Sequence, residues 1–197
     1  MPALVVPREQ TPLNMVEVTA KLAAVFHDLW GVMPSESLLR VAAGIIGIEN
    51  AGGWAIWNGN FGNVTAPAGY EGRVWEANGL YFLDFGAEIG SLEAGARAWW
   101  LLMSARYHDA LLGADQGNVR AAVRDMFRLG YVGADWTAKQ LADYTRGVDQ
   151  WAGKAAYSAK VISEHFRNRW IGVSIAASSI LAVAAGGYYW HRQRRAT

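Results

Sequence analysis

The chain has 197 residues, of which 52% are hydrophobic and 18% are charged, with a formal net charge of +1 and no Cys. This length allows one domain with a hydrophobic core, and the composition is too apolar for a disordered chain. The balanced charge argues against nucleic acid as a partner, and the lack of Cys excludes disulfides and thiolate metal sites.

The N-terminal half begins with a short segment and two helices. We expect residues 1–13 to form an N-terminal segment without a signal peptide, because they contain no basic start and no long apolar run. Residues 14–30 carry apolar side chains at helical spacing, and Gly31 ends the pattern. A second helix is predicted to begin at Ser35, which can cap it, and to run to about Asn50.

A loop rich in Gly and Asn follows, and then a predicted β-hairpin over residues 73–85. Asn78-Gly79 is a strong signal for a two-residue type I′ turn, which fixes the pairing of the strands. The predicted register pairs Ala77 with Leu80, Glu76 with Tyr81, Trp75 with Phe82, Val74 with Leu83 and Arg73 with Asp84.

Three more helical stretches are predicted, over about residues 88–107, 117–129 and 137–169. We expect the compact domain to end near residue 152 and residues 153–169 to form a helical connector. The pattern as a whole predicts a mainly α, α+β domain: a helical lobe with a small β-hairpin lobe.

Residues 170–190 predict a transmembrane helix, followed by a basic tail over residues 191–197. The 21 uncharged residues of this stretch would measure about 31 Å as a helix, which is the thickness of a hydrocarbon core. Aromatic residues lie at both ends, as in membrane-interface belts. A buried core helix is the alternative. The numbers of basic residues before and after the span are nearly equal, so the orientation of the helix in the membrane stays open. Small residues within the span would allow helix–helix self-association.

Glu49 is the candidate catalytic residue. With Leu38, Ala42 and Ile45 it occupies one stripe of the second helix, near the helix C-terminus. Desolvation and the negative end of the helix dipole both raise the pKa of a carboxyl group at such a position. A carboxyl group that is protonated near neutral pH can act as a general acid. The alternative is that Glu49 turns outward into water.

The residues after Glu49 have the chemistry of a sugar site. Trp54 and Trp57 offer stacking faces, while Asn58, Asn60 and Asn63 offer amide donors and acceptors. Such a set suits a sugar that carries an N-acetyl group. The alternative is a loop that only turns the chain and places its Trp residues in the core. The four His residues are scattered, so we expect neither a metal nor another cofactor.

The stretch LLRVAAGIIGIENAGGWAIWNGNFGNVTA, residues 38–66, resembles the signature of the glucosaminidase family of peptidoglycan hydrolases. In that family an apolar helix ends in Glu and is followed by Gly-Trp and then by Asn-x-Phe-Gly. Residues 82–111 and 127–136 also resemble family motifs and come in the same order. The resemblance covers residues 14–152. The chain departs from the family pattern at Thr137, where a second Tyr is common.

The resemblance implies a lysozyme-like fold with a glycan groove between the two lobes. It makes Glu49 the general acid and implies a second acidic residue on the β lobe, for which Glu76 is the first choice and Glu71 the second. It places Tyr131 close to the acid, whereas the alternative for this side chain is a half-buried core position. The expected substrate-binding residues are Trp54, Trp57, Asn60, Phe61, Asn63 and Trp136.

The resemblance predicts a hydrolase that cleaves β-1,4 bonds between N-acetylglucosamine and N-acetylmuramic acid. Its partners would be peptidoglycan strands and, through residues 170–190, a lipid bilayer. With no signal peptide expected, the sequence favours a phage or virion-associated lysin, located in a virion membrane or the bacterial cell envelope. The alternatives are a lytic transglycosylase of the same fold and a non-catalytic wall-binding or assembly protein.

Overall fold

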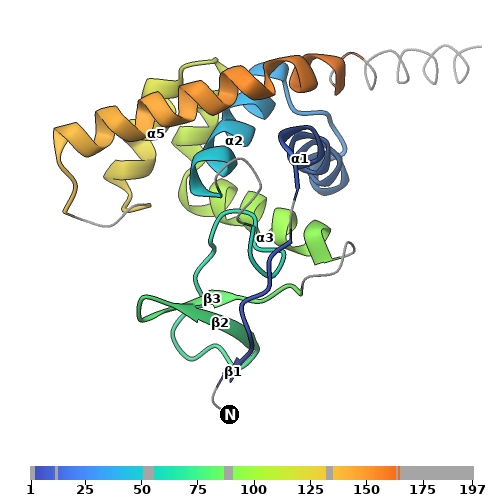
Figure 1. Ribbon diagram of the computed structural model, residues 1–197. Helices are drawn as coiled ribbons and strands as arrows, with labels where there is room; N and C mark the ends of the chain where they lie inside the picture. The colour runs from blue at the N-terminus through green and yellow to red at the C-terminus, as the bar shows by residue number, and fades with distance from the viewer. Residues whose placement is uncertain are drawn as a thin grey trace, which may run out of the picture.

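The computed structural model describes residues 3–11, 13–50, 56–86, 91–131, 135–162 and 164. It is mainly helical with a small three-stranded sheet, which confirms the predicted α+β class. Figure 1 shows the helices gathered in one lobe and the sheet in another.

The first two helices begin and end where the sequence predicted. Helix α1 (Met15–Trp30) starts with a capping box: the Asn14 side chain accepts from the N–H groups of residues 16 and 17, and Glu17 accepts from the Asn14 N–H. Gly31 ends α1 with a left-handed φ of 69°. Helix α2 (Glu36–Glu49) is capped by the Ser35 side chain, which accepts from Leu38 N. Such a cap contributes about 1 kcal/mol.

The predicted hairpin is confirmed in register and in turn geometry. Strands β2 (Arg73–Ala77) and β3 (Leu80–Leu83) pair with the predicted partners. Asn78 and Gly79 adopt φ values of 53° and 76°, as a type I′ turn requires. The rings of Trp75 and Phe82 stack with their centroids 4.4 Å apart.

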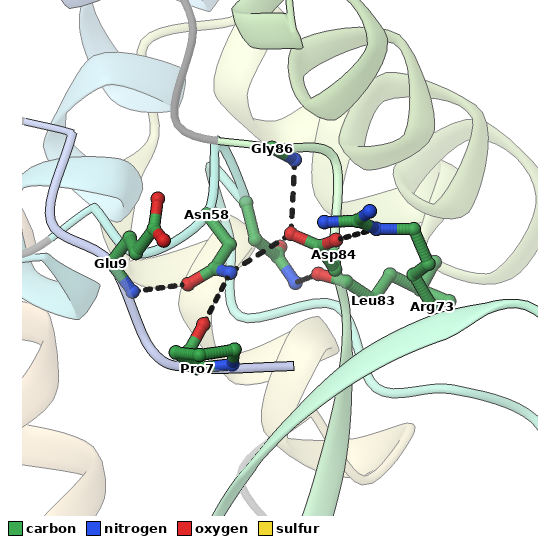
Figure 2. Close-up of polar contacts among 8 residues, drawn as sticks. Pro7, Glu9, Asn58, Arg73, Leu83, Asp84 and Gly86 are labelled. Carbon is green, nitrogen blue, oxygen red and sulfur yellow. Dashed lines mark hydrogen bonds and ion pairs between the residues drawn. The ribbon is translucent and has the colours of Figure 1, made fainter. Parts of the chain in front are cut away.

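A third strand, which the sequence did not predict, adds the N-terminal segment to this sheet. Strand β1 (Leu4–Val5) pairs in parallel with β2. Asn58 then joins the same segment to the loop and to β3: it accepts from Glu9 N at 2.8 Å and donates to Pro7 O at 3.0 Å and to Asp84 Oδ1 at 2.9 Å (Figure 2). The described part of residues 1–13 is therefore built into the β lobe.

Asp84 is the charged centre of this network. Its side chain is 1% exposed, and Oδ2 accepts from Arg73 Nε at 2.6 Å (Figure 2). Burial raises the pKa of Asp84, but hydrogen bonds from Arg73, Asn58 and the Gly86 N–H outweigh burial and hold the pKa below its usual value. Asp84 therefore stabilises the β lobe as an ionised carboxylate that binds Arg73, Asn58 and the Gly86 N–H.

The remaining helices are α3 (Ser91–Arg106), α4 (His108–Asp115), α5 (Val119–Arg128) and a long helix over residues 138–162. Three of them correspond to the predicted stretches, within the described residues. Helix α4 was not predicted. It follows α3 after the single non-helical residue Tyr107, and no turn residue marks that break.

The helix 138–162 lies across α2, as Figure 1 shows, and glycines let the two helices approach closely. A Cβ at Gly44 would lie 2.6 Å from Val148 O, and one at Gly47 would lie 2.7 Å from Trp151 Cγ. This helix continues past residue 152 without a break, and Ala155 and Ala159 belong to the main core. The predicted boundary at residue 152 therefore falls inside one packed helix.

Several predicted features lie outside the described residues: the connector beyond residue 164, the membrane span 170–190, the basic tail and Trp54. Within the ranges that the structure describes, no helix combines the length and apolar character needed to cross a membrane.

Candidate active site

Glu49 is the last residue of α2 and belongs to the predicted apolar stripe. Leu38, Ala42 and Ile45 on that stripe are 7%, 1% and 1% exposed. Glu49 itself is half-buried, so its carboxyl group packs inward while part of the residue stays accessible. Burial raises the pKa of Glu49 above that of an ordinary glutamate, against the opposing effect of hydrogen bonds from Tyr144 and Asn63. The alternative of a Glu49 turned into water does not apply.

The two oxygens of the Glu49 carboxyl group have different partners. The Tyr144 hydroxyl donates to Oε1 at 2.5 Å. The Asn63 amide nitrogen lies 3.5 Å from Oε2 and 3.3 Å from the Glu49 backbone oxygen. Burial raises the pKa of Tyr144 well above that of a free phenol, so this hydroxyl keeps its proton and acts as a donor. Oε1 therefore accepts the short hydrogen bond of the site, and Oε2 has only the long contact with Asn63.

The loop that carries Asn63 is held in place by its own buried amides. Asn60 donates to Val64 O at 2.9 Å and accepts from Val64 N at 2.8 Å, which closes a tight turn around Asn63, whose φ is 49°. Asn50 donates to Phe61 O at 2.5 Å and so ties the loop to the end of α2. Gly62 packs against the Trp99 indole, which leaves no space for a Cβ.

Tyr131, the predicted neighbour of the acid, has a buried hydroxyl group. Its ring packs against Tyr107 with centroids 5.2 Å apart, and no hydrogen bond of standard geometry reaches its buried hydroxyl from the described residues. Burial raises the pKa of Tyr131, and the negative charge of Glu49 raises it further. The phenol and the carboxyl group are thus electrostatic neighbours.

A pocket of about 380 Å³ shares Tyr144 with the Glu49 site. Its lining residues are Ile48, Phe127, Asp135, Trp136, Gln140, Asp143 and Tyr144. Tyr144 therefore both lines this pocket and donates its hydroxyl hydrogen bond to Glu49. Trp136 is 37% exposed, and its ring meets the edge of Phe127 at 5.6 Å. A pocket of this size, with an aromatic wall and a few polar groups, can hold one small polar ligand such as a sugar.

The other predicted binding residues have structural positions. Asn60 and Phe61 are fully buried, so neither side chain lines an open surface. Trp57 is half-buried, and the guanidinium of Arg8 covers its ring at 3.7 Å from the centroid. Of the predicted set within the described residues, Asn63 contacts Glu49 and Trp136 lines the pocket that includes Tyr144.

The two candidates for a second acid, Glu76 and Glu71, are both exposed. Glu76 lies on β2 and pairs across the hairpin with Tyr81. The causes of the Glu49 pKa shift are burial, Tyr144 and Asn63, and neither of these two carboxylates contributes to it.

Tyr144 is the site residue that sequence reasoning missed. A signal was present, because Leu141, Tyr144, Val148 and Ala152 follow one another at spacings of three, four and four, which is a single stripe of the helix. A hydroxyl on that buried stripe needs a partner, just as the carboxyl group of Glu49 does.

Metal binding has no support in the described part of the chain, where no three His, Cys, Asp or Glu side chains gather as a potential metal site. A scan against protein-family models, a search of curated proteins and a search of solved structures each found no match to this chain.

Proposed function

We propose that this protein cleaves the β-1,4 glycosidic bonds of peptidoglycan, with Glu49 as the general acid. The observation that carries the proposal is the buried Glu49 carboxyl group, which has a raised pKa and receives one strong hydrogen bond on Oε1 from Tyr144, a residue that also lines a pocket with a Trp wall. The motif resemblance supplies the class of substrate, N-acetylglucosamine linked to N-acetylmuramic acid.

The asymmetry of the carboxyl group suits acid catalysis. In the proposed reaction the proton of the Glu49 carboxyl group passes from Oε2 to the glycosidic oxygen, the C1–O bond breaks, and the leaving sugar departs with a new hydroxyl group. Glu49 becomes a carboxylate, and the Tyr144 hydroxyl already lies 2.5 Å from Oε1. A hydrogen bond to a charged acceptor is stronger than one to a neutral acceptor, so this bond strengthens as the negative charge develops.

The positive charge left at C1 needs a nucleophile, and the exposed positions of Glu76 and Glu71 favour a route with one enzyme carboxyl group. N-acetylated sugars supply their own nucleophile, the oxygen of the 2-acetamido group. Water then opens the intermediate, its hydroxyl stays on C1 and its proton returns to Glu49. In the second candidate reaction, lytic transglycosylation, the 6-hydroxyl of the sugar attacks C1 instead, its proton passes to the Glu49 carboxylate, and a 1,6-anhydro end is formed.

The setting of this activity is a membrane surface. Residues 170–190 anchor the chain in a bilayer, either a virion membrane or the bacterial envelope, and the domain acts on wall strands next to that bilayer. The support is the uncharged length of the span and the continuous helix 138–162 that precedes it. A virion-associated lysin predicts that the chain is found in purified phage particles. Its presence only in uninfected cell envelopes would contradict that setting.

The experiment is digestion of purified peptidoglycan by the full chain in detergent micelles, with products identified by mass spectrometry. Glu49→Gln should abolish product release. Glu76→Gln is the matched control, and because Glu76 is exposed and lacks a contact with Glu49, this variant should retain activity. Activity in Glu49→Gln, or equal loss in both variants, would contradict the assignment. Sugar binding without products in the unmodified chain would instead favour a non-catalytic wall-binding protein.

A further inference from the structure

The amide group of Gln140 is held in one orientation at the start of the helix 138–162. Gln140 Oε1 accepts from the Thr137 backbone N–H at 2.7 Å and from the Thr137 hydroxyl at 3.0 Å. In return, Gln140 N donates to Thr137 Oγ1 at 3.2 Å, which completes a capping box. A backbone N–H can only donate, so the oxygen of the amide must face Thr137 and its NH₂ group must face away.

Gln140 is also one of the residues that line the pocket of about 380 Å³ that includes Tyr144, and its side chain is exposed. Because the capping box uses the amide oxygen, the group that Gln140 has left for a ligand is its NH₂ group, which can only donate. The same lining contains Asp135 and Asp143, whose carboxylates accept. The described polar groups of the pocket therefore combine an amide donor with carboxylate acceptors.

The aromatic part of the lining adds a surface on which a sugar ring can pack. Trp136 and Tyr144 each meet Phe127 edge-on, with centroids 5.6 Å and 5.3 Å apart, and all three residues line the pocket. On such a sugar, the carbonyl oxygen of a 2-acetamido group is an acceptor that suits the Gln140 donor, and the hydroxyl groups are donors that suit the carboxylates. The lining thus matches the functional groups of an N-acetylated sugar.

The charge of the lining disfavours an acidic ligand. Asp135 and Asp143 belong to it, whereas no Lys or Arg does among the residues that the structure describes there. Two cations on the same helix, Lys139 and Arg146, pair with Asp143 at 2.5 Å and 3.4 Å and so already have a carboxylate partner. The lactyl carboxylate of N-acetylmuramic acid would meet like charge in this pocket, and the uncharged N-acetylglucosamine would not.

We propose that Gln140 is a specificity-determining residue of this pocket, and that its NH₂ group donates to the acetamido carbonyl oxygen of one N-acetylglucosamine unit. The capping box holds the donor in place before the sugar arrives, so little side-chain freedom is lost on binding. That the sugar belongs to peptidoglycan rests on the proposed function, but the orientation of the amide does not.

The test replaces the donor while keeping the helix cap. In Gln140→Glu a carboxylate oxygen still accepts from the Thr137 N–H, because Glu serves as well as Gln in a capping box, but the NH₂ donor is gone. Gln150→Glu is the matched control: Gln150 lies on the same helix, is exposed and does not belong to the described lining, and the change in charge is the same.

The readout is the Kd of N-acetylglucosamine, measured by NMR titration of the full chain in detergent micelles. We expect Gln140→Glu to raise this Kd by about three- to tenfold, which is the range of one hydrogen bond, and Gln150→Glu to leave it within about twofold. The melting temperatures of both variants should match that of the unmodified chain. Equal Kd values in the two variants, or no binding to the unmodified chain, would overturn the proposal.

A second sugar separates recognition from general damage to the pocket. Glucosamine carries an amine in place of the acetamido group, and at a pH where this amine is protonated it should bind Gln140→Glu more tightly than the unmodified chain. Weaker binding of both sugars to Gln140→Glu would overturn the proposal. In the unmodified chain, N-acetylglucosamine should bind more tightly than N-acetylmuramic acid, and the reverse order would contradict the account of the lining.

The outcomes also distinguish this inference from the proposed function. If the chain binds N-acetylglucosamine through Gln140 but releases no product from peptidoglycan, the proposed function fails and the recognition stands. If the chain releases products and Gln140→Glu changes neither Kd nor the preference between the sugars, the proposed function stands and the recognition fails.

Discussion

Replacing Tyr144 with Phe tests how the Glu49 carboxyl group is tuned. The substitution removes only the hydroxyl that donates to Glu49 Oε1 at 2.5 Å, and leaves the ring that packs on Phe127 with centroids 5.3 Å apart. A hydrogen bond to a charged group contributes about 1.5–3 kcal/mol. If this hydrogen bond reaches its full strength only when Glu49 is ionised, its loss should lower kcat by about 10- to 100-fold.

The same substitution should move the pH dependence in a defined direction. The Tyr144 hydrogen bond lowers the pKa of Glu49, so its loss raises that pKa further. A general acid must be protonated, and activity is therefore lost as the pH rises through its pKa. In Tyr144→Phe the falling limb of the rate profile should lie at higher pH than in the unmodified chain, although the plateau is lower.

The assay is the rate of soluble product release from peptidoglycan across the pH range, with thermal unfolding followed by circular dichroism. Tyr157→Phe is the matched control, because Tyr157 lies on the same helix and is 79% exposed. It should leave both rate and profile unchanged. A limb that moves to lower pH in Tyr144→Phe, or an unchanged plateau, would refute the role given to this hydroxyl.

Three further predictions concern stability. Gly62→Ala should destabilise the fold by about 1–3 kcal/mol, because its Cβ would overlap the buried Trp99 indole. Gly153→Ala, a helical site whose Cβ would meet nothing within 4 Å, should instead stabilise it by about 0.5–1 kcal/mol, and thermal melts that rank the two alike would contradict this. The third prediction concerns Asp84, whose pKa is lower in the folded protein than in the unfolded chain. This difference stabilises the fold at any pH above the unfolded pKa, and the stabilisation is lost as the pH falls through the folded pKa. The free energy of unfolding measured with urea should therefore decrease below about pH 4 in the unmodified chain, and it should decrease less in Asp84→Asn. Parallel decreases in the two proteins would show that another group is responsible.

Features set by local sequence were predicted well. The Ser35 cap, the end of the first helix at Gly31 and the Asn78-Gly79 turn each depend on a few adjacent residues, so the chain alone fixes them. The apolar stripe that ends in Glu49 is also local, because a helix repeats its faces every three to four residues.

Features set by distant contacts were not predicted. Tyr144 lies 95 positions from Glu49 along the chain, and only the crossing of two helices brings them together. Strand β1 has two residues, too few to show an alternating pattern, and it forms because β2 offers it a free edge. Asn60 and Phe61 resemble exposed loop residues in the sequence, yet tertiary packing buries both.

The most direct test of the account is mass spectrometry of peptidoglycan digested by the full chain, beside its Glu49→Gln variant. We expect soluble glycan fragments from the unmodified chain and none from Glu49→Gln. Reducing ends would establish hydrolysis, and 1,6-anhydro ends would establish the transglycosylase reaction. Fragments released equally by both proteins, or by neither, would contradict the claim that Glu49 is the acid that cleaves the glycan.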